Sequence, residues 1–150
     1  MKRASLAVVL LTVAACQSTL PIPGLGAKAT DEEKIAVVLD DVQRGVETGK
    51  VYKVLAHVSP RYHDAQGRDY EDIREYLEFI RRSYRNVRIT RTRPRIVVEG
   101  DTARALEAFG TIAESQDPDA APPVNVQGQV TVHLVREDGE WKICEWGELQ

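Results

Sequence analysis

Side chains capable of acid–base chemistry are concentrated in Ser59–Tyr70, SPRYHDAQGRDY. Asp64 could serve as a general base and Tyr62 as a hydrogen-bond donor. The same stretch fits a type I turn, with Asp64 in the first position and Gly67 in the fourth. Alternation along a short strand would place Tyr62 and Asp64 on one face and His63 on the other. We therefore favour a turn with Tyr62 packed inward over a catalytic site, and the ligand pattern of a calcium loop is missing.

Arg91, Arg93 and Arg95 lie two residues apart in an extended segment, so we expect them to share one face of a strand. Arginines in register could hold a carboxylate or a phosphate through bidentate hydrogen bonds. Alternatively, they form a solvated outer face that pairs with acids of neighbouring strands and discourages edge aggregation. We favour the solvated face.

Glu145 is the most informative acid near the C-terminus. If the EDGE segment, residues 137–140, closes a hairpin, then Arg136 faces Trp141 and Val132 faces Glu145. Glu145 would then share an otherwise apolar face with Trp141. An acid in that setting lies at the mouth of a pocket, pairs with an arginine, or has a raised pKa and acts as a general acid or base.

The opposite face of this hairpin is expected to carry His133, Cys144 and Trp146. A lone histidine there fits a surface or an interface better than a ligand site, and no second His or Cys lies at metal-binding spacing. Cys144 fits a small buried side chain, because no signature of a nucleophilic cysteine surrounds it. We expect neither a metal nor another cofactor.

Periodic apolar residues predict the helices that would position these side chains. Thr30 and Glu33 form a capping-box pattern before an apolar stripe, and Gly49 ends that helix. A short helical piece follows over residues 50–58. Asp69 then precedes a third helix, whose acidic first turn and arginine-rich last turn suit the helix dipole.

After Asn86 the apolar period changes to two, which indicates strands. We expect one strand over residues 86–98, returning strands over 102–114 and 124–136, and a last strand from Trp141. A further short strand is expected near Tyr62. This order predicts an α+β fold in which N-terminal helices pack on one side of a curved antiparallel sheet.

The N-terminus has the features of a secretory signal over residues 1–15. Lys2 and Arg3 precede an apolar run that is too short to span a bilayer as a helix, and small residues follow it. The ending VAAC resembles the lipobox of bacterial lipoproteins, with valine in place of the usual leucine. The resemblance implies that Cys16 is lipidated and holds the protein at a membrane.

Residues 16–30 contain prolines and glycines without a periodic pattern and are expected to form a tether before one folded domain over residues 31–150. In Gram-negative lipoproteins an aspartate after the cysteine commonly causes retention at the inner membrane. Gln17 at that position implies, by resemblance, a lipid-anchored protein of the cell envelope, at the outer membrane and facing the periplasm. The chain is acidic, with a formal charge of −3, which argues against nucleic-acid binding.

The order of elements, together with SPRYHDAQGR, IVVEGDTARA and VREDGEWKICEW at their spacings, resembles the nuclear transport factor 2-like superfamily. That group includes ketosteroid isomerase-like and polyketide cyclase-like (SnoaL-like) proteins, and the resemblance covers roughly residues 31–147. It implies a cone-shaped, cystatin-like fold with an apolar pocket between sheet and helices. No catalytic motif of the group matches this sequence residue by residue, so the resemblance assigns no catalytic residue.

We expect a non-enzymatic envelope lipoprotein whose pocket binds a small apolar or amphipathic ligand or a protein partner. The residues expected to line that pocket are Tyr62, Tyr76, Phe109, Trp141 and Glu145. One alternative is an isomerase, dehydratase or hydrolase with Glu145 or Asp64 as general base and Tyr62 as donor. Another is a structural module that forms a homodimer through the outer sheet face around His133 and Trp146.

Overall fold

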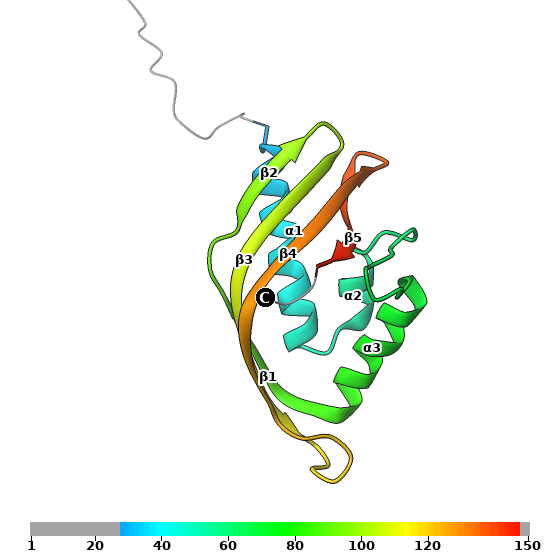
Figure 1. Cartoon of the computed structure of the whole chain (residues 1–150), viewed down its shortest axis with the longest axis vertical. Coiled ribbons are helices and arrows are strands. Elements are labelled where there is room, and N and C mark those ends of the chain that lie inside the picture. Colours follow the sequence, from blue (N-terminus) through cyan, green and yellow to red (C-terminus); the bar gives the residue numbers. More distant parts are fainter. Residues whose placement is uncertain (1–27, 148–150) are drawn as a thin grey trace, which may run out of the picture.

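A computed structural model of the protein describes residues 28–147. Its elements run in the order α1 (Asp31–Glu47), α2 (Val51–Leu55), α3 (Tyr70–Ser83), β1 (Tyr84–Arg91), β2 (Arg95–Glu99), β3 (Thr102–Ser115), β4 (Val124–Glu137) and β5 (Glu140–Trp146). The strands form one antiparallel sheet that curves around α1, and α3 stands opposite the sheet (Figure 1). The predicted α+β fold, with helices on one side of a curved antiparallel sheet, is confirmed.

The expected signal peptide (1–15), Cys16 and most of the tether lie outside the described residues. Within residues 28–147, no helix combines the length and the apolar character that crossing a bilayer requires.

Both long helices begin at the predicted caps. At α1, the Glu33 backbone N–H donates to Thr30 Oγ1 at 3.2 Å, and the Thr30 N–H donates to Glu33 Oε2 at 2.8 Å. This reciprocal pair satisfies two backbone donors that a helix start leaves free. At α3, Asp69 accepts from the N–H groups of Glu71 and Asp72 at 2.9 and 3.0 Å.

The sheet order is β1-β3-β4-β5, and β2 also pairs with β3. The single strand expected over residues 86–98 is therefore wrong, because β1 and β2 are separate strands along the same neighbour. Pro94 has no N–H group and cannot extend the ladder. Arg91 pairs with Phe109, whereas Arg95 pairs with Leu106. The segment from β1 to β2 therefore contains one residue more than the part of β3 that it faces. Because of this extra residue, Arg91 and Arg95 lie on opposite faces of the sheet.

The hairpin from β4 to β5 turns at Asp138 and Gly139, whose φ angles of 51° and 82° suit a two-residue turn. Arg136 pairs with Trp141 as predicted, but beyond Ile143 the register shifts. Cys144 is the extra residue of a β-bulge. The expected pairing of Val132 with Glu145 is thus wrong, because Val132 pairs with Trp146 instead.

The bulge exchanges the faces that we expected for two residues. Glu145 pairs with His133 on the outer face of the sheet, and Trp146 lies on the inner face with the fully buried Val132. A single outer patch of His133 and Trp146, expected as a dimer surface, therefore does not form. The predicted strand near Tyr62 is reduced to isolated bridges at Val58 and His63.

The hydrophobic core fills the end of the cone beside the β4–β5 hairpin, which we call the closed end. Ala105, Val132 and Ile143 of the sheet are fully buried there against Ile35 and neighbouring side chains of α1. At the other end of β3 and β4 the sheet bends beneath α1 toward α3 (Figure 1).

Candidate functional site

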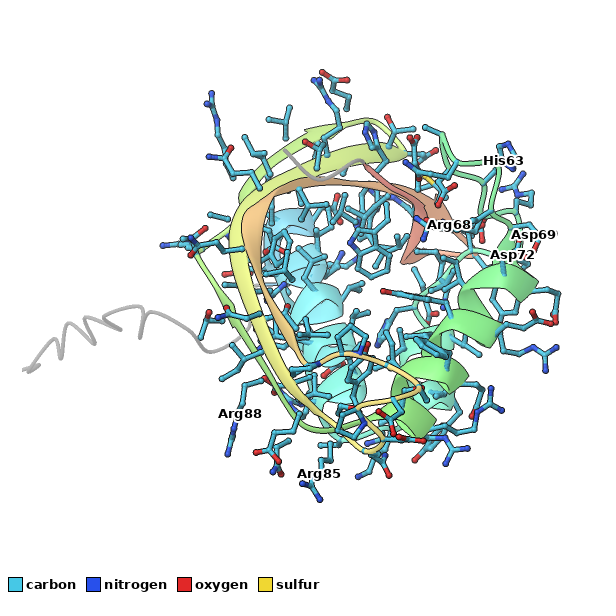
Figure 2. The ribbon with its side chains drawn as sticks, turned by 60° about the horizontal axis from the view of Figure 1, so that its bottom comes forward. His63, Arg68, Asp69, Asp72, Arg85 and Arg88 are labelled. Atoms are coloured by element: carbon cyan, nitrogen blue, oxygen red, sulfur yellow. The ribbon has the colours of Figure 1, made fainter. Side chains whose placement is uncertain are left out.

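A cavity of about 450 Å³ lies between the helices and the inner face of the sheet. Its walls are mainly apolar, with Leu39 and Val42 from α1, Leu77 and Ile80 from α3, and Ile89 and Val130 from the sheet. Figure 2 shows the sheet curving around this interior, with α3 on the opposite side. The volume is within the range of sites that bind small molecules.

Aromatic side chains line the cavity from α3 and from the sheet. Tyr76 and Phe79 of α3 line it while remaining 51% and 43% exposed to solvent. The Phe79 ring packs edge-on against Tyr84, with 6.1 Å between ring centroids. Phe109 and Trp146 line the same cavity from the sheet. A ligand in the cavity would therefore contact large apolar surfaces.

Glu107 places a carboxylate on the inner face of β3 and lines the cavity, although the residue is only 6% exposed. Arg91 Nη1 donates to both Glu107 oxygens, at 3.2 Å each. Burial raises the pKa of Glu107 above its usual value, and the charge and hydrogen bonds of Arg91 only partly oppose this effect. Asp40 raises this pKa a little further through like-charge repulsion.

Arg91 also connects the sheet to α1. Its Nε donates to Gln43 Oε1 at 2.8 Å, and its Nη2 donates to Asp40 Oδ1 at 2.5 Å. Gln43 in turn donates from Nε2 to the Ile89 carbonyl at 2.7 Å. Each nitrogen of the guanidinium thus has an acceptor, and the side chain is held in one position at the cavity wall.

The arginine face expected for residues 91–95 does not form. Arg91 is largely buried, with its side chain 11% exposed, whereas Arg93 and Arg95 are exposed. The preference for a solvated face was therefore wrong for Arg91. Arg85 and Arg88 do point away from the molecule (Figure 2).

Sequence reasoning missed Glu107, Arg91 and Trp146 as cavity residues. Glu107 could have been found, because it lies two residues before Phe109, which we had placed inward, and alternation puts both on one face. Trp146 could not be identified from the sequence as a cavity residue, because its orientation depends on the bulge at Cys144.

The stretch Ser59–Tyr70 forms the predicted turn. The Gly67 N–H donates to the Asp64 carbonyl at 2.9 Å, and Gly67 has a φ of 76°. Tyr62 and Asp64 are buried whereas His63 is exposed, as alternation predicts. Figure 2 shows His63 on the outside and Arg68 turned toward the interior.

Asp64 is occupied by hydrogen bonds from its own neighbourhood. Its side chain is 0% exposed and accepts from Tyr62 Oη at 2.9 Å, Arg68 Nε at 2.8 Å, and the N–H groups of Gln66 and Arg68 at 3.0 Å each. Burial acts to raise its pKa, but the hydrogen bonds from Arg68 and Tyr62 outweigh burial and lower it. Four donors fill the acceptor sites of a carboxylate, so this arrangement suits an anchor rather than a base.

Tyr62 lies in the core next to the cavity and is not among the residues that line it. Its hydroxyl donates to Asp64 and accepts from the Trp146 N–H at 3.1 Å. Burial raises the pKa of Tyr62 to about 12, so the hydroxyl stays protonated at neutral pH.

The five residues expected to line the pocket are brought together only in part. Tyr76 and Phe109 line the cavity, whereas Tyr62, Trp141 and Glu145 do not. Trp141 is 3% exposed at the closed end, where Arg136 lies 4.6 Å from its ring centroid. Glu145 lies on the outer face because of the bulge.

Neither a reactive thiol nor a metal site is indicated among residues 28–147. Burial raises the pKa of the Cys144 thiol, which favours the unreactive protonated form. Among residues 28–147, no three His, Cys, Asp or Glu side chains are grouped so that they could hold a metal ion.

Comparison with known families gives one match over most of the chain: the family profile described as SnoaL-like domain matches residues 28–147. No curated protein sequence matches significantly.

Solved structures with the same fold are numerous. A candidate scytalone dehydratase from Novosphingobium aromaticivorans superposes with a TM-score of 0.67 at 17% identity, covering 76% of this chain and 79% of that one. A nuclear transport factor 2-like superfamily protein from Salmonella enterica gives a TM-score of 0.65 at 15% identity, covering 77% of this chain and 87% of that one. A protein with a cystatin-like fold from Nostoc punctiforme gives a TM-score of 0.60 at 13% identity, covering 81% of this chain and 92% of that one. At these identities the likeness shows the fold alone.

Proposed function

This chain belongs to the SnoaL-like domain family of the nuclear transport factor 2-like superfamily, and we propose that it binds a small apolar or amphipathic molecule without transforming it. The observation that carries the proposal is the cavity of about 450 Å³, with apolar walls and the buried Glu107–Arg91 pair in its lining. A site of this kind gains affinity from apolar burial and orients its ligand through a few polar groups.

The chemistry of the cavity supports binding more than catalysis. The candidate donor and base of the opening stretch, Tyr62 and Asp64, hydrogen-bond to each other outside the cavity lining. No histidine is among the described residues that line the cavity. Glu107 is paired with Arg91, which the sheet and α1 hold in place.

Native mass spectrometry of the full chain, purified from its own cells, tests this proposal. We expect a small molecule that is retained under native conditions and lost on denaturation. Thr111→Trp should greatly reduce retention, because Thr111 lines the cavity and the indole would occupy part of it. Ile112→Trp is the matched control, since Ile112 is 54% exposed on the outer face. Equal retention by both variants would place the ligand elsewhere and contradict the proposal.

A second candidate is an enzyme that uses Glu107 as a general base, because burial raises the pKa of this carboxyl toward the working range of such a group. A candidate dehydratase is among the structures with the same fold. The two functions are separated by incubating the retained molecule with the chain. A binding domain returns it unchanged. An enzyme converts it, with a rate that rises as pH increases through the raised pKa, since only the ionised carboxylate accepts a proton.

For the N-terminus we propose export and lipidation at Cys16, supported by the VAAC sequence and the basic, apolar segment before it. Mass spectrometry of the mature protein should find acyl chains on Cys16 as the first residue. Cys16→Ala should move the protein from the membrane fraction to the soluble fraction, while Cys144→Ala should leave it membrane-bound. An unmodified wild-type N-terminus would exclude the lipid anchor.

A further inference from the structure

Glu107 and Arg91 differ in how many hydrogen bonds they can still make, and the difference limits which ligands fit the cavity. We infer that the ligand presents a hydrogen-bond donor, a hydroxyl or an amino group, to Glu107, and that the cavity discriminates against carboxylates and phosphates. This inference rests on the proposed function and specifies the polar end of the ligand.

The Glu107 carboxylate has unused acceptor capacity. A carboxylate can accept about four hydrogen bonds. Among the described residues, Glu107 accepts only from Arg91, and a single nitrogen, Nη1, is shared between both oxygens at 3.2 Å. Both distances are longer than the about 2.7–2.9 Å that is usual for a charge-assisted N–H···O bond. A donor group of a ligand would therefore add bonds that the protein does not supply to this buried carboxylate.

The guanidinium of Arg91, by contrast, is largely committed to protein acceptors, because each of its three nitrogens already donates to one. Its Nε and Nη2 donate to Gln43 and Asp40 at 2.8 and 2.5 Å, and its Nη1 faces Glu107. An acceptor group of a ligand would have to compete with these contacts. Arg91 thus behaves as a fixed counter-charge and is poorly placed to hold an incoming anion.

The charges around this wall also disfavour an anion. Two carboxylates, those of Glu107 and Asp40, contact the one guanidinium of Arg91. Arg68, the other arginine that lines the cavity, donates from Nε to the buried Asp64 at 2.8 Å and is thereby neutralised. An anionic ligand near Glu107 would experience net repulsion in a poorly solvated site.

Three probes of similar shape separate these effects: 2-naphthol carries a donor, 2-methylnaphthalene carries none, and 2-naphthoate is an anion. Each is titrated into the full chain by calorimetry at pH 7.5. We expect 2-naphthol to bind about tenfold more tightly than 2-methylnaphthalene, which corresponds to one net hydrogen bond to a charged group. We expect 2-naphthoate to bind most weakly. Tightest binding by 2-naphthoate would overturn the inference and leave the proposed cavity function intact.

Glu107→Gln removes the charge at nearly constant shape, and it should improve the affinity of 2-naphthoate about tenfold relative to 2-methylnaphthalene. Glu114→Gln is the matched control, because Glu114 lies on the outer face of the same strand and pairs with Arg85 of β1 at 3.0 Å. If the three probes rank in the same order of affinity in both variants, Glu107 has no role in selecting the ligand. The order of the three probe affinities for the wild type tests the inference even if Glu107→Gln is unstable. Failure of all three probes to bind the wild type would overturn the proposed function itself.

Discussion

Glu107 and Asp64 are both buried carboxylates beside an arginine, yet their surroundings shift their pKa values in opposite directions. Asp64 accepts four hydrogen bonds within its own turn, and these outweigh burial. Glu107 accepts from one arginine nitrogen, and burial dominates. The number of donors, more than the depth of burial, thus separates a structural anchor from a carboxylate that is available to a ligand.

Asp64→Asn should lower the free energy of unfolding by about 1–3 kcal/mol at pH 7, because the amide cannot replace the charged hydrogen bonds to Arg68 and Tyr62. The pKa of Asp64 is lower in the folded state than its ordinary value of 3.8. Its stabilisation is therefore complete above that value and is lost as pH falls through the folded-state pKa. Urea unfolding of wild type and variant should show a difference that shrinks as the pH is lowered from 6 to 3.

Asp119→Asn serves as the control for this experiment, because Asp119 is exposed in the loop between β3 and β4. We expect it to leave stability unchanged across the same pH range. A pH-independent loss in Asp64→Asn would show that the turn, rather than the ionised carboxylate, accounts for the effect.

At the scale of elements, the bulge in β5 decides which tryptophan faces the cavity. The edge of β5 is held by the segment before α3, since the Ser59 and His63 N–H groups donate to the carbonyls of Ile143 and Cys144 at 2.8 and 3.1 Å. Tyr62 Oη then accepts from the Trp146 N–H beyond the bulge. The stretch Ser59–Tyr70 thus positions the end of β5, which forms part of the cavity wall through Trp146.

Tyr62→Phe should remove the acceptor of the Trp146 N–H and destabilise the protein by about 1–2 kcal/mol. Hydrogen exchange at the Trp146 amide should accelerate, because the strand end opens locally more often. Tyr52→Phe is the control, as Tyr52 is 69% exposed on α2. Unchanged protection of the Trp146 amide in Tyr62→Phe would mean that the hydroxyl does not hold the bulge.

Local chemistry made several elements predictable from the sequence. The capping box at Thr30, the cap at Asp69 and the two-residue turn at Asp138 and Gly139 depend on neighbouring residues alone. The inward position of Phe109 follows from alternation. The bulge at Cys144 depends on contacts with the distant segment around Tyr62, which no local pattern reveals, and Glu145 was misplaced for that reason.

At the scale of the whole molecule, one sheet has a packed end and a hollow end. Val132 and Val126 both lie on the inner face of β4, but Val132 is 0% exposed in the core and Val126 is 39% exposed at the cavity. Small residues, Ala103 and Ala105, lie opposite Leu134 and Val132 at the closed end. The curvature of the sheet thus separates a packed end, which stabilises the fold, from a hollow end, where we propose that a ligand binds.

Val132→Ala should therefore cost roughly 2 kcal/mol of unfolding free energy, since it removes buried methyl groups and leaves a void. Val126→Ala, the same substitution on the same face, should cost less than about 0.5 kcal/mol. Chemical denaturation of both variants measures the difference. Equal losses would indicate that the cavity end is as densely packed as the closed end.

The central claim is that the cavity is a binding site, and calorimetric titration of 2-naphthol tests it most directly. We predict one bound molecule per chain for the wild type and for Ile112→Trp, and at least a tenfold loss of affinity for Thr111→Trp. Equal affinity in the two tryptophan variants, or no binding by the wild type, would contradict the account.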